Sequence, residues 1–514
     1  MKRNLLFIIA LFVCAFSFGQ GEIDAYRYSS TDLSGTARGQ AMGGAFGALG
    51  GDVTGVAINP AGIGIYRSSE IVGNISLTSP LIQGNTNLES NTTGALDNLS
   101  YVGYYPLVNG NMLSLNFGFN YSRIKSFEQR YNASRPAMSS SLTDYMALLT
   151  NGVYSSAFDN NPYDNSDIRW LSILAWDGYL INPVNPGNSR NDKYKTVLSE
   201  NEQVRPNLKV SEKGKIESYD FTIGSNISDQ FYWGATLSLT ELSYLMTSSY
   251  DEQFLGEDGG GFELENYLRT KGSGIQMKVG AIFRPSDVLR IGIAYHSPTW
   301  YTMTDYFHAR VIPRGIYYDE GRQSAGITET PNDAYVSYDF RTPGSFTLSL
   351  AAILGTRAIV SVDYENKNYA SMNLKDRNGN AWDVNDTINN HYKNTSTLRA
   401  GLEYRFTPQF SGRLGYAWAQ NPYRKNVSSM GEIVETAGTV PHYVLSNCAN
   451  YFTAGVGFKF TPQFYMDFAL VLRSQSDYLY YFQPVKNDDV LPDSFEDSFT
   501  NRTLKGLITL GYKF

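Results

Sequence analysis

Few side chains of this 514-residue chain are spaced for catalysis or for metal binding. Zinc sites need several His or Cys ligands in short, recurring spacings such as HExxH. The sequence holds no such spacing, and its four histidines lie far apart: His296, His308, His391 and His442. No GxSxG turn, Walker A loop or dinucleotide-binding fingerprint stands between an expected strand and helix. We therefore expect no enzyme activity, no metal and no cofactor.

Two groups of polar residues could suggest other chemistry. Residues 376–380, with the sequence DRNGN, are a fragment of a calcium loop that lacks the later ligands, so we interpret them as a polar turn. A mixed set of charges falls on the expected inward faces of strands. Such charges can satisfy one another in a wet barrel interior, so we interpret them as a lumen lining. This set comprises Asp363, Glu365, Lys367, Arg399, Glu403, Arg405, Arg413 and Arg473.

The stretch from Gly35 to Tyr66 is rich in glycine and alanine and lies just before the first expected strand. Its small residues allow close backbone packing, and its glycines permit turns with positive φ. Asn59, Pro60, Ala61 and Gly62 form the sharpest point, because Asn and Pro favour turn initiation and Gly can close the turn. By itself the stretch is either a connector or a compact plug, and the rest of the chain must decide between them.

The N-terminus has the pattern of a secretory signal peptide over residues 1–19. Lys2 and Arg3 form a basic start, residues 5–16 form an apolar core, and the SFG sequence before Gln20 is a small-x-small cleavage site. The chain is therefore expected to be exported. Its net charge of −7, with no basic stripe, argues against a nucleic-acid partner.

The two cysteines support neither a lipid anchor nor a disulfide framework. Cys14 follows bulky Val13, where a lipoprotein signal needs a small residue, and the second cysteine is Cys448. Beyond the signal peptide no apolar run reaches the roughly 18 residues of a spanning helix. A membrane barrel, however, exposes its apolar residues at every second position, so a mean hydropathy of −0.30 does not exclude it.

Fourteen segments of about nine or more residues alternate with a period of two, and an even count is typical of a bacterial outer-membrane barrel. In one of them Leu398 and Leu402 share one face while Arg399 and Glu403 share the other. We predict an all-β fold, a 14-stranded antiparallel transmembrane β-barrel. The expected strands are 68–78, 98–106, 112–126, 215–227, 229–246, 272–284, 287–304, 344–354, 357–369, 395–407, 409–420, 449–461, 463–475 and 502–514.

The connections between these strands separate a barrel from a soluble sandwich, which would also alternate. Six connections are short, and two of them repeat the sequence FTPQF, at 406–410 and 460–464. The seven intervening connections are long, and the longest spans 127–214. Short periplasmic turns opposite long extracellular loops are the asymmetry of an outer-membrane barrel. The last strand ends on Phe514, which resembles the C-terminal signal that the outer-membrane assembly machinery recognises.

The long loop 127–214 contains two helical patterns. Leu142, Tyr145, Met146 and Leu149 follow the spacing of one helix face. A second piece is apolar nearly all round and includes Trp170, Leu171, Leu174 and Trp176. Such helices need burial on more than one side. They are expected to pack over the barrel mouth and could also line an extracellular groove for a hydrophobic ligand.

Taken together, the signal peptide, the Asn59 to Gly62 turn with residues 35–45 before it, residues 413–417 with Pro422, and the terminal Phe514 resemble the FadL family of outer-membrane transporters for long-chain fatty acids and other hydrophobic compounds. The style of the signal peptide and loops suggests a Bacteroidetes-type member. The resemblance implies an N-terminal hatch at 20–67 inside the lumen of a barrel at 68–514. It also implies a distorted third strand with a lateral gap, for which the inward Gly118 is the candidate kink.

These observations lead to one main functional hypothesis and two alternatives. The first is a monomeric outer-membrane channel for passive uptake of hydrophobic small molecules, gated by the hatch and releasing its ligand laterally into the membrane. The second is a FadL-like barrel that acts in protein interaction or as a secretion shuttle. The third, an outer-membrane hydrolase, would need a charged cluster with Ser, His or Asp at the barrel rim.

Overall fold

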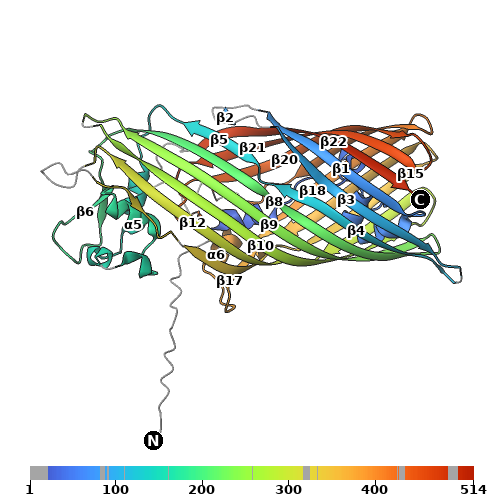
Figure 1. The fold of residues 1–514 in the computed structure, drawn as a ribbon, viewed down its shortest axis with the longest axis horizontal. Helices are drawn as coiled ribbons and strands as arrows, with labels where there is room; N and C mark the ends of the chain where they lie inside the picture. The colour runs from blue at the N-terminus through green and yellow to red at the C-terminus, as the bar shows by residue number, and fades with distance from the viewer. Residues whose placement is uncertain are drawn as a thin grey trace, which may run out of the picture.

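A computed structural model of the chain shows one closed antiparallel barrel with helices inside it and at one end (Figure 1). The predicted signal peptide lies outside the described residues, and so do several short stretches. The structure describes residues 21–81, 87–88, 92–108, 110–159, 161–257, 259–316, 325–332, 334–424, 427, 434–483 and 496–514.

The barrel wall has fourteen strands, as the sequence predicts. Two of them are interrupted, at residues 297–299 and 342–344, so that each consists of two consecutive segments. In order around the wall they are β1 (Glu70–Leu81), β3 (Thr93–Pro106), β4 (Met112–Ser126), β8 (Val204–Ile227), β9 (Phe231–Phe254), β10 (Gly261–Phe283), β11 (Leu289–His296) with β12 (Trp300–Arg314), β15 (Ser345–Leu354) with β14 (Tyr335–Arg341), β16 (Ala358–Asn368), β18 (Asn394–Arg405), β19 (Phe410–Ala419), β20 (Tyr443–Lys459), β21 (Phe464–Tyr480) and β22 (Glu496–Lys513).

The C-terminal strand closes the barrel. β22 pairs with β1 from Glu70 opposite Lys513 to Leu81 opposite Arg502. The backbone N–H of Phe514 then donates to Ser69 O over 3.0 Å. Because the last residues form the closing seam, the aromatic end of the chain is a structural part of the wall.

The outer face of the wall is apolar over a broad band. Met277 and Leu470, for example, are each 57 % exposed, whereas their neighbours Lys278 and Ala469 are buried on the inner face. An apolar outside, a polar inside and full closure of the sheet satisfy every requirement of a strand-built membrane span. The protein is therefore an integral outer-membrane barrel. Among the described residues, no helix is long and apolar enough to cross a membrane.

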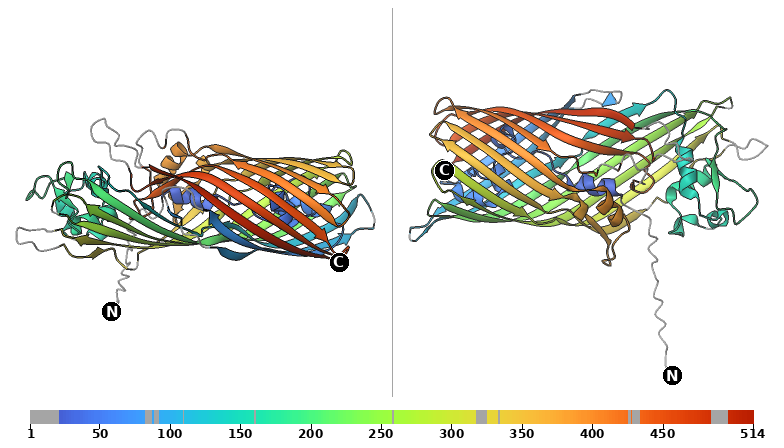
Figure 2. Two further views of the ribbon diagram at one scale, coloured as in Figure 1. Left: turned by 90° about the horizontal axis from the view of Figure 1, so that it is seen from above. Right: turned by 180° about the vertical axis from the view of Figure 1, so that it is seen from behind.

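The six short turns gather at the end of the barrel that carries the C-terminus, and the long connections at the other end (Figures 1 and 2). The two FTPQF turns form the same hydrogen bond, from the first Phe N–H to the last Phe carbonyl, over 3.0 Å in each. In each turn the two Phe rings also stack. This confirms the predicted sorting of short and long connections to opposite ends, which are called the periplasmic and extracellular ends below, as the sequence predicts them.

Several strands continue far beyond the membrane band, which the sequence did not indicate. β8, β9 and β10 each have 23 or 24 residues, and β8 begins at Val204, eleven residues before the predicted strand start at 215. Its first half is interrupted by Pro206 and Gly214 and carries many charges, so it resembles loop sequence. In the structure Leu208 and Val210 face inward and Lys209 faces outward, in regular alternation.

Smaller elements complete the extracellular end and the interior. Residues 376–380 form a polar turn, as expected, because the Asp376 carboxylate accepts from the N–H groups of Asn378 and Asn380, each over 2.8 Å. The extracellular elements are β2 (Asn87–Leu88), β5 (Gln129–Ser134), α4 (Leu142–Thr150), η2 (Ser155–Phe158), η3 (Pro162–Asp164), α5 (Trp170–Asp177), β6 (Ile181–Pro183), β7 (Tyr194–Thr196), β13 (Thr328–Glu329), η4 (Tyr369–Ser371), β17 (Asn373–Asp376) and α6 (Val384–His391). The interior elements are α1 (Glu22–Ser29), α2 (Ala37–Ala41), α3 (Val53–Ile58) and η1 (Pro60–Ile65).

Candidate functional site

Residues 21–66, called the N-terminal segment below, lie inside the barrel (Figure 2). Most of their side chains are buried. The short helices are held by side-chain caps, since Thr36 caps α2 and Asp52 caps α3, and the Thr36 hydroxyl donates to Asp52 over 2.9 Å. These caps let a Gly- and Ala-rich stretch keep a fixed shape without an apolar core of its own.

The turn predicted at Asn59 to Gly62 is present and is fully buried. Asn59 accepts from Ala61 N over 3.1 Å through its side-chain oxygen and donates to Gly47 O over 2.8 Å and to the wall at Ala281 O over 3.2 Å. Pro60 begins the 3₁₀ helix η1, where its missing N–H is not needed. The turn is thus bonded both to the N-terminal segment and to β10.

Glycines in the wall strands leave the space into which this turn packs. A Cβ at Gly280 would lie 1.9 Å from the Asn59 side-chain oxygen, and one at Gly234 would lie 2.3 Å from Pro60 O. Gly224 and Gly118 give the same close access to Ile63. These glycines occur at inward positions of neighbouring strands, and apart from Gly118, which was expected to form a kink, none of them was predicted to have a role. An isolated inward Gly in a strand is a signal of close backbone approach that could have found them.

Other strands of the wall bind the N-terminal segment through polar side chains. Asp363 accepts from the N–H groups of Phe46 and Gly47 over 3.0 and 2.9 Å. Thr453 donates to Ala41 O over 2.8 Å. Further bonds of this kind join Asn74 to Gly35 O, Thr509 to Ala37 N, Asn116 to Ile63 O, Arg290 to Leu49 O and His296 to Ile58 O.

A chain of four charges, three of them buried and Arg38 partly buried, links the segment to the wall strands β18, β19 and β21. Arg38 donates to Glu403 over 2.8 and 3.1 Å, Glu403 also accepts from Arg413 over 2.7 Å, and Arg413 donates to Asp467 over 2.5 Å. Glu403 and Arg413 belong to the charged set that the sequence assigned to the lumen. The structure adds Arg38 as their partner from the N-terminal segment.

The start of the segment is anchored at the extracellular end. The Glu22 carboxylate lies 2.8 Å from His391 Nδ1 on α6, and Tyr392 donates to Glu22 O over 3.0 Å. Burial raises the pKa of the Glu22 carboxyl, while the neighbouring His391 acts in the opposite direction. Tyr26 packs against the rings of Tyr369, Tyr392 and Tyr423. Both ends of the segment are therefore fixed.

Two adjoining cavities lie beside the least buried part of the segment, residues 30–34. Their volumes are about 280 and 300 Å³, and together they are called the chamber. Charged and aromatic side chains line both parts, among them Lys125, Arg473, Tyr26 and Tyr451. Apolar side chains also line the smaller cavity, among them Ile23, Leu33, Pro80, Phe127, Val444 and Val471.

The wall opens beside the chamber between β3 and β4. Their ladder ends at Asn98 opposite Ser122, and within the part of the chain that the structure describes no backbone hydrogen bond joins residues 93–97 to residues 123–127. β4 shifts its register between Arg123 and Lys125. Above this region β2 pairs with β5 and closes the gap again. We call the unpaired region the window.

Residues from both sides close the window. Asp97 of β3 pairs with Arg123 of β4 over 2.6 Å and with Lys505 of β22 over 2.6 Å. From the inside, Asp32 N donates to Ile124 O over 3.0 Å, and the Asp32 carboxylate accepts from Ser126 N over 3.3 Å. The N-terminal segment therefore covers the stretch of β4 that lacks a partner in β3.

Outside the window the wall forms an apolar groove of about 990 Å³. Small residues form its floor, including Gly94, Ala95 and Gly506, and Leu77 and Leu470 stand beside them. Gly94 and Ala95 lie in the unpaired part of β3, so the groove begins at the edge of the window.

β4, the third strand of the wall, is irregular, but not at Gly118, where the kink was expected. At Gly118 the ladder is regular, with Val102 on one side and Thr222 on the other, so no kink occurs there. Gly118 instead makes room for Ile63 of the N-terminal segment. β4 shifts its register against β8 at two places, between Met112 and Ser114 and between Arg123 and Lys125. Neither place has a glycine, so these irregularities were not visible in the sequence.

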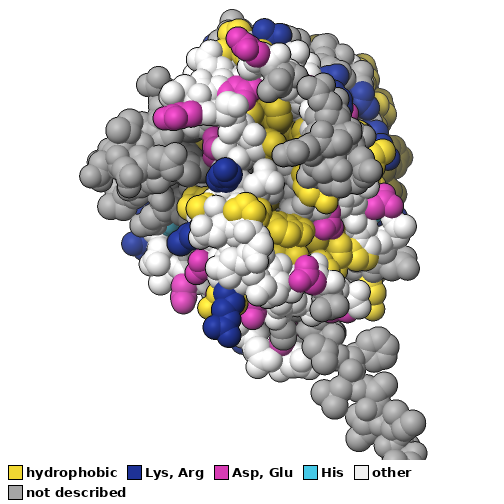
Figure 3. All heavy atoms as spheres, turned by 90° about the vertical axis from the view of Figure 1, so that its left-hand side faces the viewer, with side chains coloured by type: hydrophobic (Ala, Val, Ile, Leu, Met, Phe, Trp, Pro, Cys, Tyr) yellow, Lys and Arg dark blue, Asp and Glu magenta, His cyan; other side chains and the backbone are white. Residues whose placement is uncertain are grey.

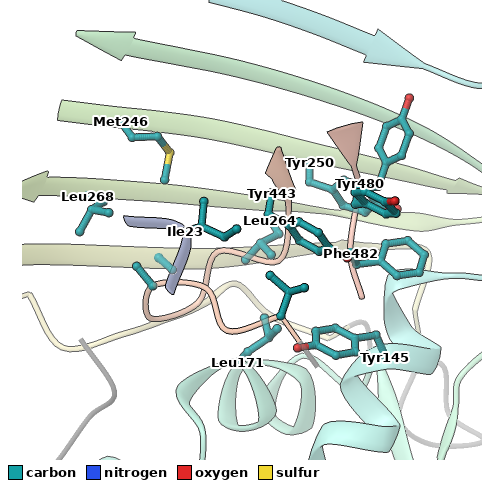
Figure 4. Close-up of a cluster of buried hydrophobic side chains, with 14 of the residues drawn as sticks. Ile23, Tyr145, Leu171, Met246, Tyr250, Leu264, Leu268, Tyr443, Tyr480 and Phe482 are labelled. Carbon is teal, nitrogen blue, oxygen red and sulfur yellow. The ribbon is translucent and has the colours of Figure 1, made fainter. Parts of the chain in front are cut away.

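The helices of the long loop pack into a closed core and show little open groove. Leu142, Met146, Leu171 and Leu174 are almost fully buried, Tyr145 is also buried, and Leu149, Trp170 and Trp176 pack against them. In Figure 4, Tyr145 and Leu171 lie beside Ile23 of α1 and side chains of β9 and β10. Hydrophobic side chains also show among polar ones on the extracellular end (Figure 3). The core closes the extracellular mouth above the chamber.

No family model matches the chain, and no curated protein matches it. Among solved structures, a Pseudomonas aeruginosa FadL homologue is 13 % identical, with a TM-score of 0.53, and the match covers 94 % of this chain and 99 % of that one. The monoaromatic hydrocarbon channel CymD is 12 % identical with a TM-score of 0.49, covering 94 % and 98 %. The Ralstonia pickettii toluene transporter TbuX is 14 % identical with a TM-score of 0.47, covering 94 % and 98 %. The chain therefore has the fold of a FadL homologue, with an N-terminal segment inside a 14-stranded outer-membrane barrel.

Proposed function

We propose that this protein is an outer-membrane channel for the passive uptake of hydrophobic small molecules such as long-chain fatty acids. The main support is the continuity of three features: the chamber, the window between β3 and β4, and the apolar groove outside it. A hydrophobic molecule that reaches the chamber has a route into the membrane that avoids the water beyond the periplasmic end. The FadL-type fold and the hydrocarbon and toluene transport named for two similar structures agree with this proposal.

The chamber lining favours an amphiphile with an anionic head. Lys125 and Arg473 reach both parts of the chamber and could hold a carboxylate. The apolar side chains of the smaller cavity, such as Leu33 and Phe127, suit a hydrocarbon tail. Head and tail would thus both lie in the chamber, beside residues 30–34.

In this proposal the moving part of the hatch is residues 30–34. The Asn59 to Gly62 turn is bonded to the wall on several sides, and α1 is fixed to α6 by Glu22. Between these anchors, residues 30–34 are the least buried stretch and contact β4 through Asp32. A local shift of this stretch would uncover the window, while the rest of the hatch stays in the lumen.

A reversible cross-link tests the gate. The backbone N–H of Asp32 donates to Ile124 O over 3.0 Å, so these two segments lie side by side and are the natural positions for a cysteine pair. The test variant carries Asp32→Cys and Ile124→Cys in a Cys448→Ser background, and uptake of a fluorescent fatty acid into reconstituted vesicles is measured. When the cysteine pair is oxidised, uptake should fall to the level of protein-free vesicles. Reductant should restore it.

The control is a cross-link within the wall. Ile293 and Leu348 are paired neighbours on β11 and β15, on the lipid-facing side and away from the groove. Ile293→Cys with Leu348→Cys should leave uptake unchanged in both redox states. Equal uptake by the oxidised and reduced Asp32–Ile124 variant would refute gating by this stretch.

Asp97 provides a second prediction. Its carboxylate is 1 % exposed and neutralises Arg123 across the window and Lys505 of β22 on its own side of the window. Asp97→Asn leaves both cations without their anion, so we expect a stability loss of about 3–5 kcal/mol together with faster uptake through a looser window. Urea unfolding and initial uptake rates measure the two effects, and slower uptake in folded protein would contradict the assignment.

A further inference from the structure

Just beyond the apolar band, the outer face of β8, β9 and β10 carries a cluster of cations. Lys215 and Lys271 flank Ser243 in one row across the sheet, and Lys213 and Arg269 flank Leu245 in the next row. All four basic side chains are exposed. The last apolar row below them contains Tyr219, Leu239 and Ile275, so these cations lie at the height of lipid headgroups.

Most of this positive charge has no protein counter-ion. Lys215 pairs with Glu217 over 2.7 Å, and Glu241 lies opposite Glu217 in the row below. Among the described residues, Lys213, Arg269 and Lys271 form no ion pair. By contrast, cations further from the membrane on the same sheet are paired, as Arg310 is with Glu265 and Arg314 with Asp251, each over 2.5 Å.

Directly above the cations the same outer face is hollowed into a groove of about 780 Å³. Ser211, Thr247 and Ser249 form its centre, where short side chains leave space between longer ones. Tyr267 and Arg130 stand at its sides. The groove therefore offers hydroxyl groups, an aromatic ring and a basic rim next to the cationic rows.

We propose that this groove and the cationic rows bind the headgroup of a phosphorylated glycolipid in the outer leaflet. The phosphate would be held by Lys213, Arg269 and Lys271. Hydrogen bonds from Lys and Arg to phosphate are charge-assisted and therefore stronger than those between neutral groups. Hydroxyl side chains and the Tyr267 ring suit a sugar, which presents hydroxyl groups and an apolar face. The acyl chains would lie on the apolar band immediately below.

Charge and position together favour this occupant over a protein partner. The cations face outward at the membrane surface, where anionic headgroups are concentrated. A simple anionic phospholipid would engage the cations but would leave the hydroxyl-lined groove empty. The proposal therefore predicts a preference for a phosphorylated sugar headgroup over a phosphatidylglycerol headgroup.

Binding to the full barrel in detergent tests the proposal, with lipid A, dephosphorylated lipid A and phosphatidylglycerol as separate probes. Native mass spectrometry should show lipid A retained by the wild type above the other two. The triple variant Lys213→Gln, Arg269→Gln, Lys271→Gln should bind lipid A on the order of a hundredfold more weakly, since each basic residue near an anionic surface contributes roughly a factor of five.

The matched control removes three extracellular cations away from the membrane: Arg190→Gln, Lys195→Gln and Arg314→Gln. It should bind lipid A like the wild type, and heat-modifiable mobility in gels should show both variants folded. Thr247→Leu, which fills the groove, should remove the preference for lipid A over phosphatidylglycerol. Equal binding of the two lipids by the wild type, or full lipid A binding by the first triple variant, would overturn the proposal.

Discussion

Replacing Glu403 by Gln should detach the N-terminal segment from β18 and cost about 3–5 kcal/mol of stability, because it leaves two cations facing each other. Glu403 is the one anion between Arg38 and Arg413, at 2.8 and 2.7 Å. Asp467 continues to neutralise Arg413, so the larger loss falls on Arg38 and on the segment that carries it. The effect should therefore appear first as local opening of α2 inside an intact barrel.

Hydrogen exchange of the backbone around residues 37–41, together with urea unfolding, measures this effect. The control is Asp287→Asn, which removes the anion of an exposed pair with Arg284. Exposed pairs contribute little, so this variant should unfold like the wild type. Unchanged protection of α2 in Glu403→Gln would show that the charge chain does not hold the segment.

Gly280→Leu should push the Asn59 to Gly62 turn off the wall and leave a conducting pore. Even a Cβ at Gly280 would lie 1.9 Å from the Asn59 side-chain oxygen and 3.2 Å from Pro60 Cδ, so the turn must move. Overpacking of this kind typically costs about 1–3 kcal/mol. Because the wall is closed by its own ladder, the strain should be relieved by the segment and not by β10.

Planar-bilayer recordings measure the result, since ion conductance through a plugged lumen is expected to rise when the turn is displaced. Gly73→Leu serves as the control, because a Cβ there approaches only Leu99, at 4.0 Å. That variant should conduct like the wild type. If Gly280→Leu folds and conducts no more than Gly73→Leu, the turn does not hold the plug in position.

The two variants act on different parts of the wall. Glu403 lies on β18, four strands away from β10, which carries Gly280. Neither residue belongs to residues 30–34, so the variants test anchoring of the segment and not gating. Loss of an anchor should raise ion leakage. A cross-link that locks residues 30–34 should stop ligand uptake and leave ion leakage unchanged.

The barrel itself could be predicted because its determinants are local. A period of two with apolar residues on one face sets each strand, and Pro or Gly in a short connection sets each periplasmic turn. The FTPQF turns illustrate this, since both copies form the same hydrogen bond in the structure. The extracellular extensions of β8 to β10 were missed because their outward residues are polar and Pro206 and Gly214 interrupt the pattern.

The sequence by itself determined the closed, exported, membrane-facing barrel and the existence of a compact Gly- and Ala-rich segment before it. Only the tertiary structure decided what that segment touches. The pairing of Arg38 with Glu403 joins residues 365 positions apart, and the fit of Asn59 against Gly280 joins residues 221 positions apart. The window beside Asp97 exists because the ladder between β3 and β4 ends early. Strand alternation fixes which way a side chain points, but closure, stagger and the path of the inserted segment fix which side chains meet inside the lumen.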